Sequence, residues 1–297
     1  MRIFVTGGTG YIGSAVVREL AEAGHAVVAL TRLAERSSYL DGLGARITVV
    51  GDVRDAGAWR EAALESDALV HLAAEDSDAR AEADRAALNT LLDAGTAGRP
   101  RSLVYTSGCF ILGETGDEPV GEDGSTAGAP PLVAWRTAHE RRVLAADGPE
   151  LATAVIRPGM VYGGKEGAFS DFFATAETDG SARFVGDGAN HWSPVYRGDV
   201  ARLYRTVLER RGRGIFHGAE PAARVGDLAV AASRAAGAGG ATERWRVEDA
   251  RTSMGPFADA LTMNQVLGWP RSRALGWEPV HPPFEESAEA VYREWKA

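Results

Sequence analysis

The residues with the clearest chemical potential are glycines close to the N-terminus. They lie in the segment Val5-Thr6-Gly7-Gly8-Thr9-Gly10-Tyr11-Ile12-Gly13, which follows an apolar strand-like segment and precedes residues with helical spacing. Glycine allows positive φ and the close approach of a ligand, and the N-terminus of a helix presents free N–H groups and a positive dipole end to an anion. We therefore predict a pyrophosphate site, with binding residues Gly7, Thr9, Gly10, Tyr11, Ile12 and Gly13.

The end of the second predicted strand, residues 25–30, is expected to select the cofactor. Thr31 and Arg32 follow this strand, whereas an acidic residue would be needed to bind the 2′-hydroxyl of NAD. Arginine suits a 2′-phosphate, so we predict NADP(H) rather than NAD(H) as the cofactor. The alternative is that Arg32 is a solvated surface residue.

The elements that must position these residues alternate along the chain. Short apolar segments, separated by amphipathic helical segments, predict strands at the N-terminus and at residues 25–30, 47–50, 68–72, 102–106 and 153–157. Such alternation predicts a parallel sheet with right-handed crossovers and a ligand site beyond the carboxyl ends of the strands. We expect an α/β protein with a Rossmann-type doubly wound parallel sheet and a smaller C-terminal substrate-binding lobe.

The predicted boundaries place an NAD(P)-binding Rossmann domain at residues 1–160. Residues 161–297 are expected to form mainly the substrate lobe, because the alternation loosens there and aromatic residues become frequent. A more regular segment, about residues 195–217, is expected to return to the Rossmann domain.

Composition limits the classes of partner. The chain has 297 residues, a net charge of −9 and no basic run, which argues against nucleic acid and favours a small-molecule partner. It shows no signal-peptide pattern and no apolar run of membrane-spanning length, so we expect a cytoplasmic protein without membrane contact. Cys109 is the single cysteine and the six histidines show no paired ligand spacing, so no metal site is predicted.

The order and spacing of several further motifs resemble the extended short-chain dehydrogenase/reductases, in their epimerase/dehydratase-like branch. The matching segments, besides the glycine turn, are residues 51–55, 71–74, 104–107, 157–163, 185–188 and 199–201. This resemblance implies a cofactor site that extends well beyond the glycine turn. Asp52 and Val53 would contact the adenine, residues 72–74 would line the phosphate and ribose, and residues 158–160 would lie beside the nicotinamide. The residues assigned to the cofactor are Asp52, Val53, Leu72, Ala73, Ala74, Thr106, Arg136, Pro158, Gly159 and Met160.

The catalytic residues of the family are missing from this sequence. The family uses a tyrosine and a lysine spaced Y-x-x-x-K, with a serine or threonine beside them. Alignment on Glu140 puts Leu132 at the tyrosine position and Arg136 at the lysine position. The serine position falls on Gly108, with Ser107 one residue earlier. Only two lysines are present in the chain, neither close to Leu132, so no shift in register restores the motif.

Three hypotheses for function remain. General acid–base catalysis typically accelerates a reaction about 10²–10⁴-fold. A reductase without the tyrosine would therefore suit a substrate that needs little proton donation, such as an iminium or an enone. Arg136 could stabilise the negative charge that develops on an enone or carbonyl oxygen. Arg136 would also bind the nicotinamide ribose. The alternative is that ribose binding is its only role. The second hypothesis is a non-redox enzyme, a cyclase, lyase or isomerase, with Cys109 near the reaction centre. The third is a regulatory protein that senses NADP(H). The candidate catalytic residues are Arg136, Ser107 and Cys109.

The substrate is predicted to be an apolar or aromatic small metabolite. Family members that act on nucleotide-diphosphate sugars carry an arginine shortly after Gly-Asp-Gly, and Trp192 takes its place here. The predicted substrate pocket comprises Leu132, Phe169 and Trp192. His139 is expected at the surface or an interface, and the resemblance makes a homodimer through helices near residues 81–94 and 133–146 plausible.

Overall fold

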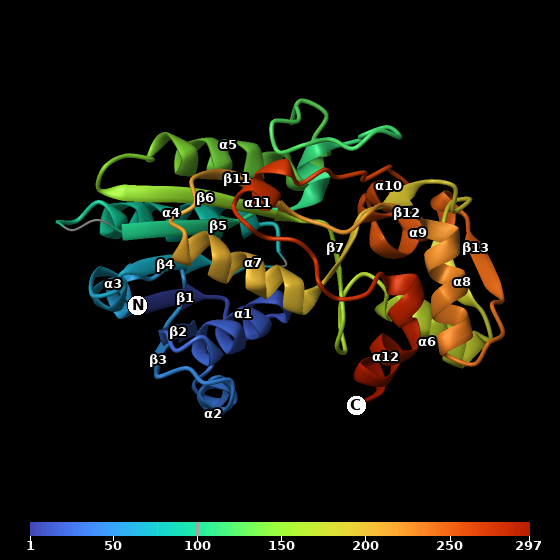
Figure 1. The fold of residues 1–297 in the computed structure, drawn as a ribbon, viewed down its shortest axis with the longest axis horizontal. Helices are drawn as coiled ribbons and strands as arrows, with labels where there is room; N and C mark the ends of the chain where they lie inside the picture. Colours follow the sequence, from blue (N-terminus) through green and yellow to red (C-terminus); the bar gives the residue numbers. More distant parts are fainter. Residues whose placement is uncertain (76, 99–100) are drawn as a thin grey trace.

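Seven parallel strands form one central sheet in a computed structural model, which describes residues 1–75, 77–98 and 101–297 (Figure 1). The strand order is β11-β6-β5-β4-β1-β2-β3, with each neighbouring pair parallel. This topology confirms the predicted Rossmann-type doubly wound sheet. The strands are β1 Arg2–Thr6, β2 Ala26–Thr31, β3 Ile47–Val50, β4 Ala68–His71, β5 Arg101–Thr106, β6 Leu151–Pro158 and β11 Gly214–Gly218.

Helices cover both faces of the sheet, and the alternation of side chains along each strand explains how. Val5 packs in a core with α1 (Tyr11–Glu22) and α7 (Arg197–Glu209), whereas its neighbour Phe4 packs in a second core with α3 (Arg60–Leu64), α4 (Arg80–Gly95) and α5 (Pro131–Ala145). Both residues are fully buried. Burial on both faces is the reason that these strands read as continuous apolar runs.

The connections contain short helices as well. Residues 56–64 between β3 and β4 form the 3₁₀-helix η2 (Ala56–Ala58) followed by α3. The other short elements on this half are η1 (Ala34–Arg36), α2 (Ser37–Gly42) and η3 (Cys109–Leu112). None of the helices within the described ranges is long and apolar enough to cross a membrane.

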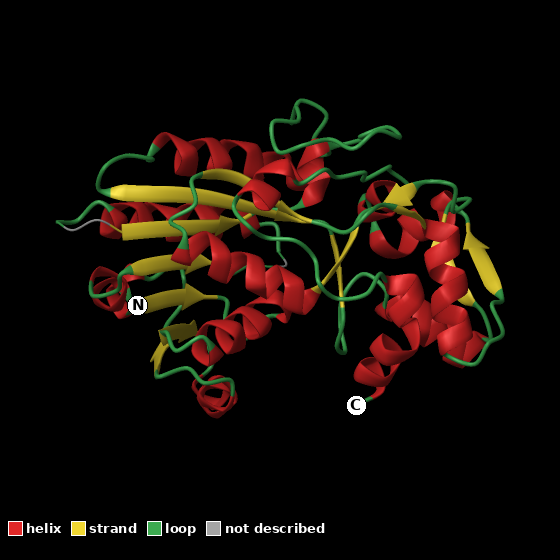
Figure 2. Cartoon of the chain, in the orientation of Figure 1, coloured by secondary structure: helices red, strands yellow, loops and turns green. Residues whose placement is uncertain are grey.

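A smaller lobe of helices and short strand pairs lies at the right of Figure 2. Its strands pair as β10-β7, β12-β9 and β13-β8, and its core is rich in phenylalanine and alanine. The elements are β7 Met160–Tyr162, α6 Ser170–Asp179, β8 Ala182–Val185, β9 His191–Trp192, β10 Pro194–Tyr196, β12 Ala223–Arg224, α8 Val225–Ala235, β13 Thr242–Trp245, α9 Val247–Met254, α10 Phe257–Leu261 and α12 Phe284–Lys296.

The chain passes between the two regions more than once. After β10 it forms α7, which packs on α1, and then β11, the edge strand beside β6. Helix α11 (Pro270–Ala274) also packs near β11, and Trp277 is buried in the core between α1, α7 and the sheet. The predicted domain boundaries stay a prediction.

Candidate active site

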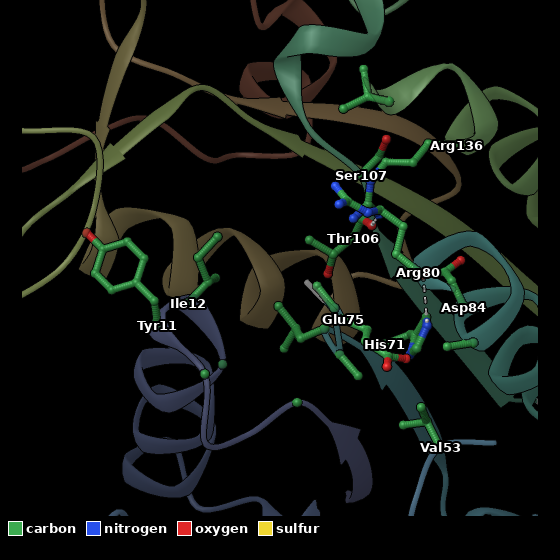
Figure 3. Close-up of a pocket in the computed structure, with 18 of the residues that line it drawn as sticks. Tyr11, Ile12, Val53, His71, Glu75, Arg80, Asp84, Thr106, Ser107 and Arg136 are labelled. Carbon is green, nitrogen blue, oxygen red and sulfur yellow. Dashed lines mark hydrogen bonds and ion pairs between the residues drawn. The ribbon is translucent and has the colours of Figure 1, made fainter. Parts of the chain in front are cut away.

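A cavity of about 1000 Å³ opens at the carboxyl ends of β1, β2, β4 and β5. Figure 3 shows Tyr11 and Ile12 on one side of this cavity and Thr106, Ser107 and Arg136 on the other. The cavity brings together predicted site residues from six separate segments of the sequence. Those lining it are Gly7, Thr9, Gly10, Tyr11, Ile12, Gly13, Arg32, Asp52, Val53, Leu72, Ala73, Ala74, Thr106, Ser107, Leu132 and Arg136.

The glycine turn is packed too tightly for larger residues. Gly7 has φ +73°, and a Cβ atom there would lie 2.5 Å from the backbone nitrogen of Ala73. A Cβ atom on Gly13 would lie 2.0 Å from the carbonyl oxygen of Gly7. Gly10 is the N-cap of α1 and, because glycine has no side chain, it does not cap the first N–H groups of the helix. These groups therefore remain available to an anion at the helix N-terminus.

The end of the cavity near β2 and β3 carries charged residues. Arg32 is exposed at its rim. Asp52 forms a two-point ion pair with Arg54, in which Nε lies 3.0 Å from Oδ1 and Nη2 lies 2.9 Å from Oδ2. The hydrogen bond from Arg54 is the main cause that lowers the pKa of Asp52 to about 2. Asp52 therefore remains ionised at neutral pH, and its backbone carbonyl accepts from the indole of Trp59.

The opposite end of the cavity contains Leu132, Arg136 and Ser107, the residues that the sequence predicts at or beside the family's catalytic positions. Arg136, on α5, donates from Nη1 to the hydroxyl of Tyr105 (3.2 Å) and to the carbonyl oxygen of Thr106 (3.1 Å). Its guanidinium carbon lies 4.4 Å from the ring centroid of Trp135. The Ser107 hydroxyl is buried, and no hydrogen-bond partner for it is found within residues 1–75, 77–98 and 101–297. Leu132 adds no polar group here.

A buried polar network at this end was not anticipated, and two of its members, Asp84 and His71, also line the cavity. Asp84, on α4, accepts from the Tyr105 hydroxyl (3.0 Å) and lies 2.6 Å from Nδ1 of His139. Nε2 of His71 lies 3.3 Å from the other carboxylate oxygen, and Nδ1 of His71 lies 2.6 Å from Oγ1 of Thr6. Burial opposes ionisation of Asp84, but the contacts with His139 and His71 outweigh it and lower its pKa. An acidic residue among the apolar positions of the helix predicted at residues 81–94 was the available signal.

The placement of His139 was predicted wrongly. Its side chain is 8% exposed and contacts Asp84 inside the protein, and its ring lies edge-on to Trp135 with 5.1 Å between centroids. It follows Arg136 by nearly one turn of α5, so a pattern-based prediction placed it on the outer face. The buried carboxylate of Asp84 compensates for burying the imidazole.

Several predicted site residues lie away from the cavity lining. Cys109 is buried, and desolvation raises its pKa to about 12, so the thiol is a poor nucleophile here. Phe169 and Trp192 belong to the core of the smaller lobe, where both stack on Phe172. The nicotinamide segment predicted from the family is also buried outside the lining; it comprises Pro158, Gly159 and Met160.

The aromatic and apolar side chains that do line the cavity come from other segments. Phe110 from η3 meets Phe257 from α10 edge to face, with 6.0 Å between ring centroids. Trp135, Met254 and Pro256 line the same cavity. Residues 254–257 belong to a C-terminal segment that no motif connected to the site, so only the fold reveals this wall.

Comparison with known proteins agrees with this architecture. The model of the NAD dependent epimerase/dehydratase family matches residues 3–216. The chain belongs to this family. A 2-alkyl-3-oxoalkanoate reductase from Stenotrophomonas maltophilia is 31% identical over 72% of this chain and 67% of its own length.

Two solved structures share the fold of this family member. Human epimerase family protein SDR39U1 with NADPH has a TM-score of 0.81 at 22% identity and covers 99% of both chains. A dTDP-glucose 4,6-dehydratase from Streptomyces venezuelae with NAD bound has a TM-score of 0.82 at 23% identity, covering 100% of this chain and 97% of that one. Since the two neighbours carry different nicotinamide cofactors, the preference of this chain must be argued from its own residues.

Proposed function

We propose that the protein is an NADPH-dependent reductase for an apolar or aromatic small molecule with a C=N, enone or carbonyl group, and that it works without the family tyrosine. One observation carries this proposal: Leu132 and Arg136, at the positions of the missing tyrosine and lysine, lie in the same cavity as the glycine turn. The 2-alkyl-3-oxoalkanoate reductase among the relatives supports a reductase in particular.

The residues present fit a dinucleotide. The glycine turn leaves no room for a Cβ atom at Gly13, and α1 begins at the cavity with uncapped N–H groups that suit the pyrophosphate. Arg32 at the rim suits a 2′-phosphate. NADPH supplies a hydride when bound.

The residues at the far end would stabilise charge and exclude water. The guanidinium of Arg136 offers a fixed positive charge to an oxygen that becomes negative during reduction. The Ser107 hydroxyl has unused hydrogen-bonding capacity and lies at the same end. Leu132, Phe110 and Phe257 provide apolar contact area for the substrate and lower the local polarity around the arginine.

The alternative functions have less support. The non-redox hypothesis relied on Cys109, whose thiol is buried and whose pKa is raised to about 12. The sensor hypothesis requires only the nucleotide half of the cavity and gives no reason for the apolar wall. A homodimer through α4 and α5 and a cytoplasmic location stay predictions.

Cofactor titration tests the first half of the proposal. Nicotinamide fluorescence should report tighter binding of NADPH than of NADH, and Arg32→Asp should weaken NADPH binding far more than NADH binding. Arg46→Asp is the charge-matched control, because Arg46 is exposed at the opposite end of the β2–β3 pair and does not line the cavity. An unchanged preference in Arg32→Asp would refute the assignment of the 2′-phosphate.

Turnover tests the second half. Purified protein with NADPH is given benzylideneacetone, a dihydroisoquinolinium salt, 1-phenyl-1,2-propanedione and the keto sugar nucleotide dTDP-4-dehydrorhamnose, and loss of nicotinamide absorbance is followed. We expect oxidation of NADPH with at least one aromatic probe and none with the nucleotide sugar. Cofactor binding without turnover of any aromatic probe would contradict a reductase and favour the non-redox or sensor hypothesis.

A further inference from the structure

We propose that Asp84 and Tyr105 are positioning residues for Arg136, holding its guanidinium where it binds an anionic oxygen on a planar aromatic ligand. The inference rests on the proposed function in taking this ligand to be the substrate of the reductase. It concerns residues at which the family resemblance assigns no role, and it follows from a continuous chain of hydrogen bonds from α5 through β5 to α4.

The chemistry of the three groups fixes the direction of this chain. Arginine can only donate and an ionised carboxylate can only accept, so the tyrosine between them must do both. Nη1 of Arg136 lies 3.2 Å from the Tyr105 oxygen, and that oxygen lies 3.0 Å from Oδ2 of Asp84. Burial, with the nearby negative charge of Asp84, raises the pKa of Tyr105, so the phenol keeps its proton and donates it to Asp84.

The position of Tyr105 in the sheet explains why this residue can link the two helices. Its side chain is fully buried on the face of the sheet covered by α4 and α5, while the next residue, Thr106, contacts Tyr204 on α7 at the opposite face. A tyrosine ring at the end of a strand is rigid, because it has only two side-chain dihedral angles and is packed on His71, 5.9 Å between centroids. The hydroxyl is therefore a fixed point for Arg136.

Asp84 anchors α5 at two places. It contacts His139 directly and Arg136 through Tyr105, and these two residues lie nearly one helical turn apart. His71 lies at its other oxygen, so the carboxylate itself has little freedom. A long arginine side chain normally samples many rotamers, and holding one of them beforehand reduces the ordering cost when a ligand binds.

The aromatic residues around Arg136 and its remaining N–H groups indicate the kind of ligand. The Trp135 ring lies 4.4 Å from the guanidinium carbon, and Phe110 and Phe257 lie in the same cavity. With Nη1 engaged by Tyr105 and Thr106, the remaining N–H groups can meet an oxyanion or carboxylate. A planar aromatic body with one anionic oxygen matches both features.

A double-mutant cycle with trans-cinnamate as the probe tests the proposal. Calorimetry measures cinnamate affinity for wild type, Tyr105→Phe, Arg136→Met and the double variant, each with and without NADP⁺. Arg136→Met should weaken binding about 10- to 100-fold, and Tyr105→Phe about 3- to 10-fold. In the Arg136→Met background, Tyr105→Phe should have no further effect, because its contribution acts through the arginine.

Two further variants separate positioning from general destabilisation. Tyr196→Phe is the matched control, since its hydroxyl also donates to a carboxylate (3.0 Å to Glu294) but lies in the smaller lobe, and it should leave cinnamate affinity unchanged. Asp84→Asn, which keeps an acceptor for Tyr105 but removes the charge, should weaken binding in the same direction as Tyr105→Phe. The cinnamate affinities of Tyr196→Phe and Asp84→Asn are compared with that of wild type at a temperature at which all three proteins are folded.

The outcomes distinguish this inference from the proposed function. Equal losses from Tyr105→Phe in the wild-type and Arg136→Met backgrounds would overturn the positioning role, as would cinnamate binding that Arg136→Met leaves unchanged. Either result could coexist with NADPH oxidation in the turnover assay. Conversely, Tyr105→Phe could weaken cinnamate binding in wild type but not in Arg136→Met while the protein fails to oxidise NADPH. That combination would support the positioning of Arg136 and reject only the reductase.

Discussion

Glu220 is expected to make the stability of this protein depend on pH. Its side chain is 2% exposed, and Oε1 accepts from the Tyr162 hydroxyl (2.9 Å) and from the backbone N–H of Tyr196 (3.0 Å). Burial raises its pKa from 4.5 to about 7, because the two hydrogen bonds only partly offset the loss of hydration. The folded protein therefore binds the proton of Glu220 more tightly than the unfolded chain does.

The size and sign of the effect follow from that difference. The folded pKa exceeds the unfolded one, so the contribution to stability is fully present below about pH 4.5 and is lost as the pH rises through about 7. A difference of about 2.5 pKa units corresponds to about 3 kcal/mol in the free energy of unfolding. Glu220→Gln stays neutral at every pH and keeps an oxygen acceptor for Tyr162 and Tyr196.

Urea unfolding followed by tryptophan fluorescence measures this effect at about pH 5 and about pH 8. The two proteins should have similar free energies of unfolding at the lower pH, and Glu220→Gln should be the more stable by up to about 3 kcal/mol at the higher pH. Glu289→Gln, an exposed change in α12, is the control and should leave the pH dependence unaltered. If wild type and Glu220→Gln differ equally at both pH values, ionisation of Glu220 does not govern stability and the reasoning is refuted.

Two other predictions concern the cavity and the single thiol. Gly13→Ala should abolish NADPH binding, because the new Cβ would lie 2.0 Å from the carbonyl oxygen of Gly7. The control Gly42→Ala, whose Cβ would have no atom within 4 Å among those described, should bind NADPH normally. Fluorescence titration compares the two variants, and NADPH binding retained in Gly13→Ala would show that the turn can rearrange. Cys109 should resist iodoacetamide in the folded protein and react after denaturation, because the thiol is buried and its pKa is raised to about 12. Mass spectrometry detects the labelled cysteine. Rapid labelling of the native protein would contradict the buried placement of Cys109.

The sheet and the glycine turn were predictable because both depend on local sequence. Strands buried on both faces are continuous apolar runs, and a turn with no space for side chains must be glycine, so each leaves a signal in a few adjacent residues. The cavity lining near Arg32 and Arg136 followed from the rule that ligands bind at the carboxyl ends of parallel strands. The pyrophosphate and ribose roles of these residues stay predictions.

The aromatic residues of the smaller lobe show where this approach fails. Phe169 and Trp192 looked like pocket residues because they are aromatic and follow the Rossmann segment, yet both are packed in a core. Phe257 lines the cavity although no local pattern distinguishes it. Composition cannot separate an aromatic core from an aromatic wall, because both need the same side chains and differ only in tertiary contacts.

The polar network at Asp84 was missed for a related reason. Acidic residues on a predicted helix normally indicate the solvated face, and Asp84 shares its predicted helix with Glu82 and Asp93, so its position among the apolar residues was only a weak signal. His139 was likewise expected at the surface or an interface. Both are buried because they compensate each other across two helices that are far apart in the sequence. Pairwise compensation of this kind becomes visible only when the packing of α4 against α5 is known.

The predicted replacement of tyrosine by Leu132 and of lysine by Arg136 would change what the site can do, not only how fast it does it. Arginine keeps its proton at any pH that a folded protein tolerates, so Arg136 can stabilise negative charge but cannot relay a proton. Leu132 offers no donor and, like Phe110, lines the same cavity as Arg136 with an apolar side chain. A less polar cavity strengthens the attraction of a guanidinium for an anionic oxygen. Such a site favours enones, whose developing negative charge is delocalised onto an oxygen, over ketones that require protonation as the hydride arrives. An iminium needs no proton donor either, because the hydride neutralises its positive charge, although Arg136 would not assist it. These are the physical reasons to test both classes of probe before simple ketones.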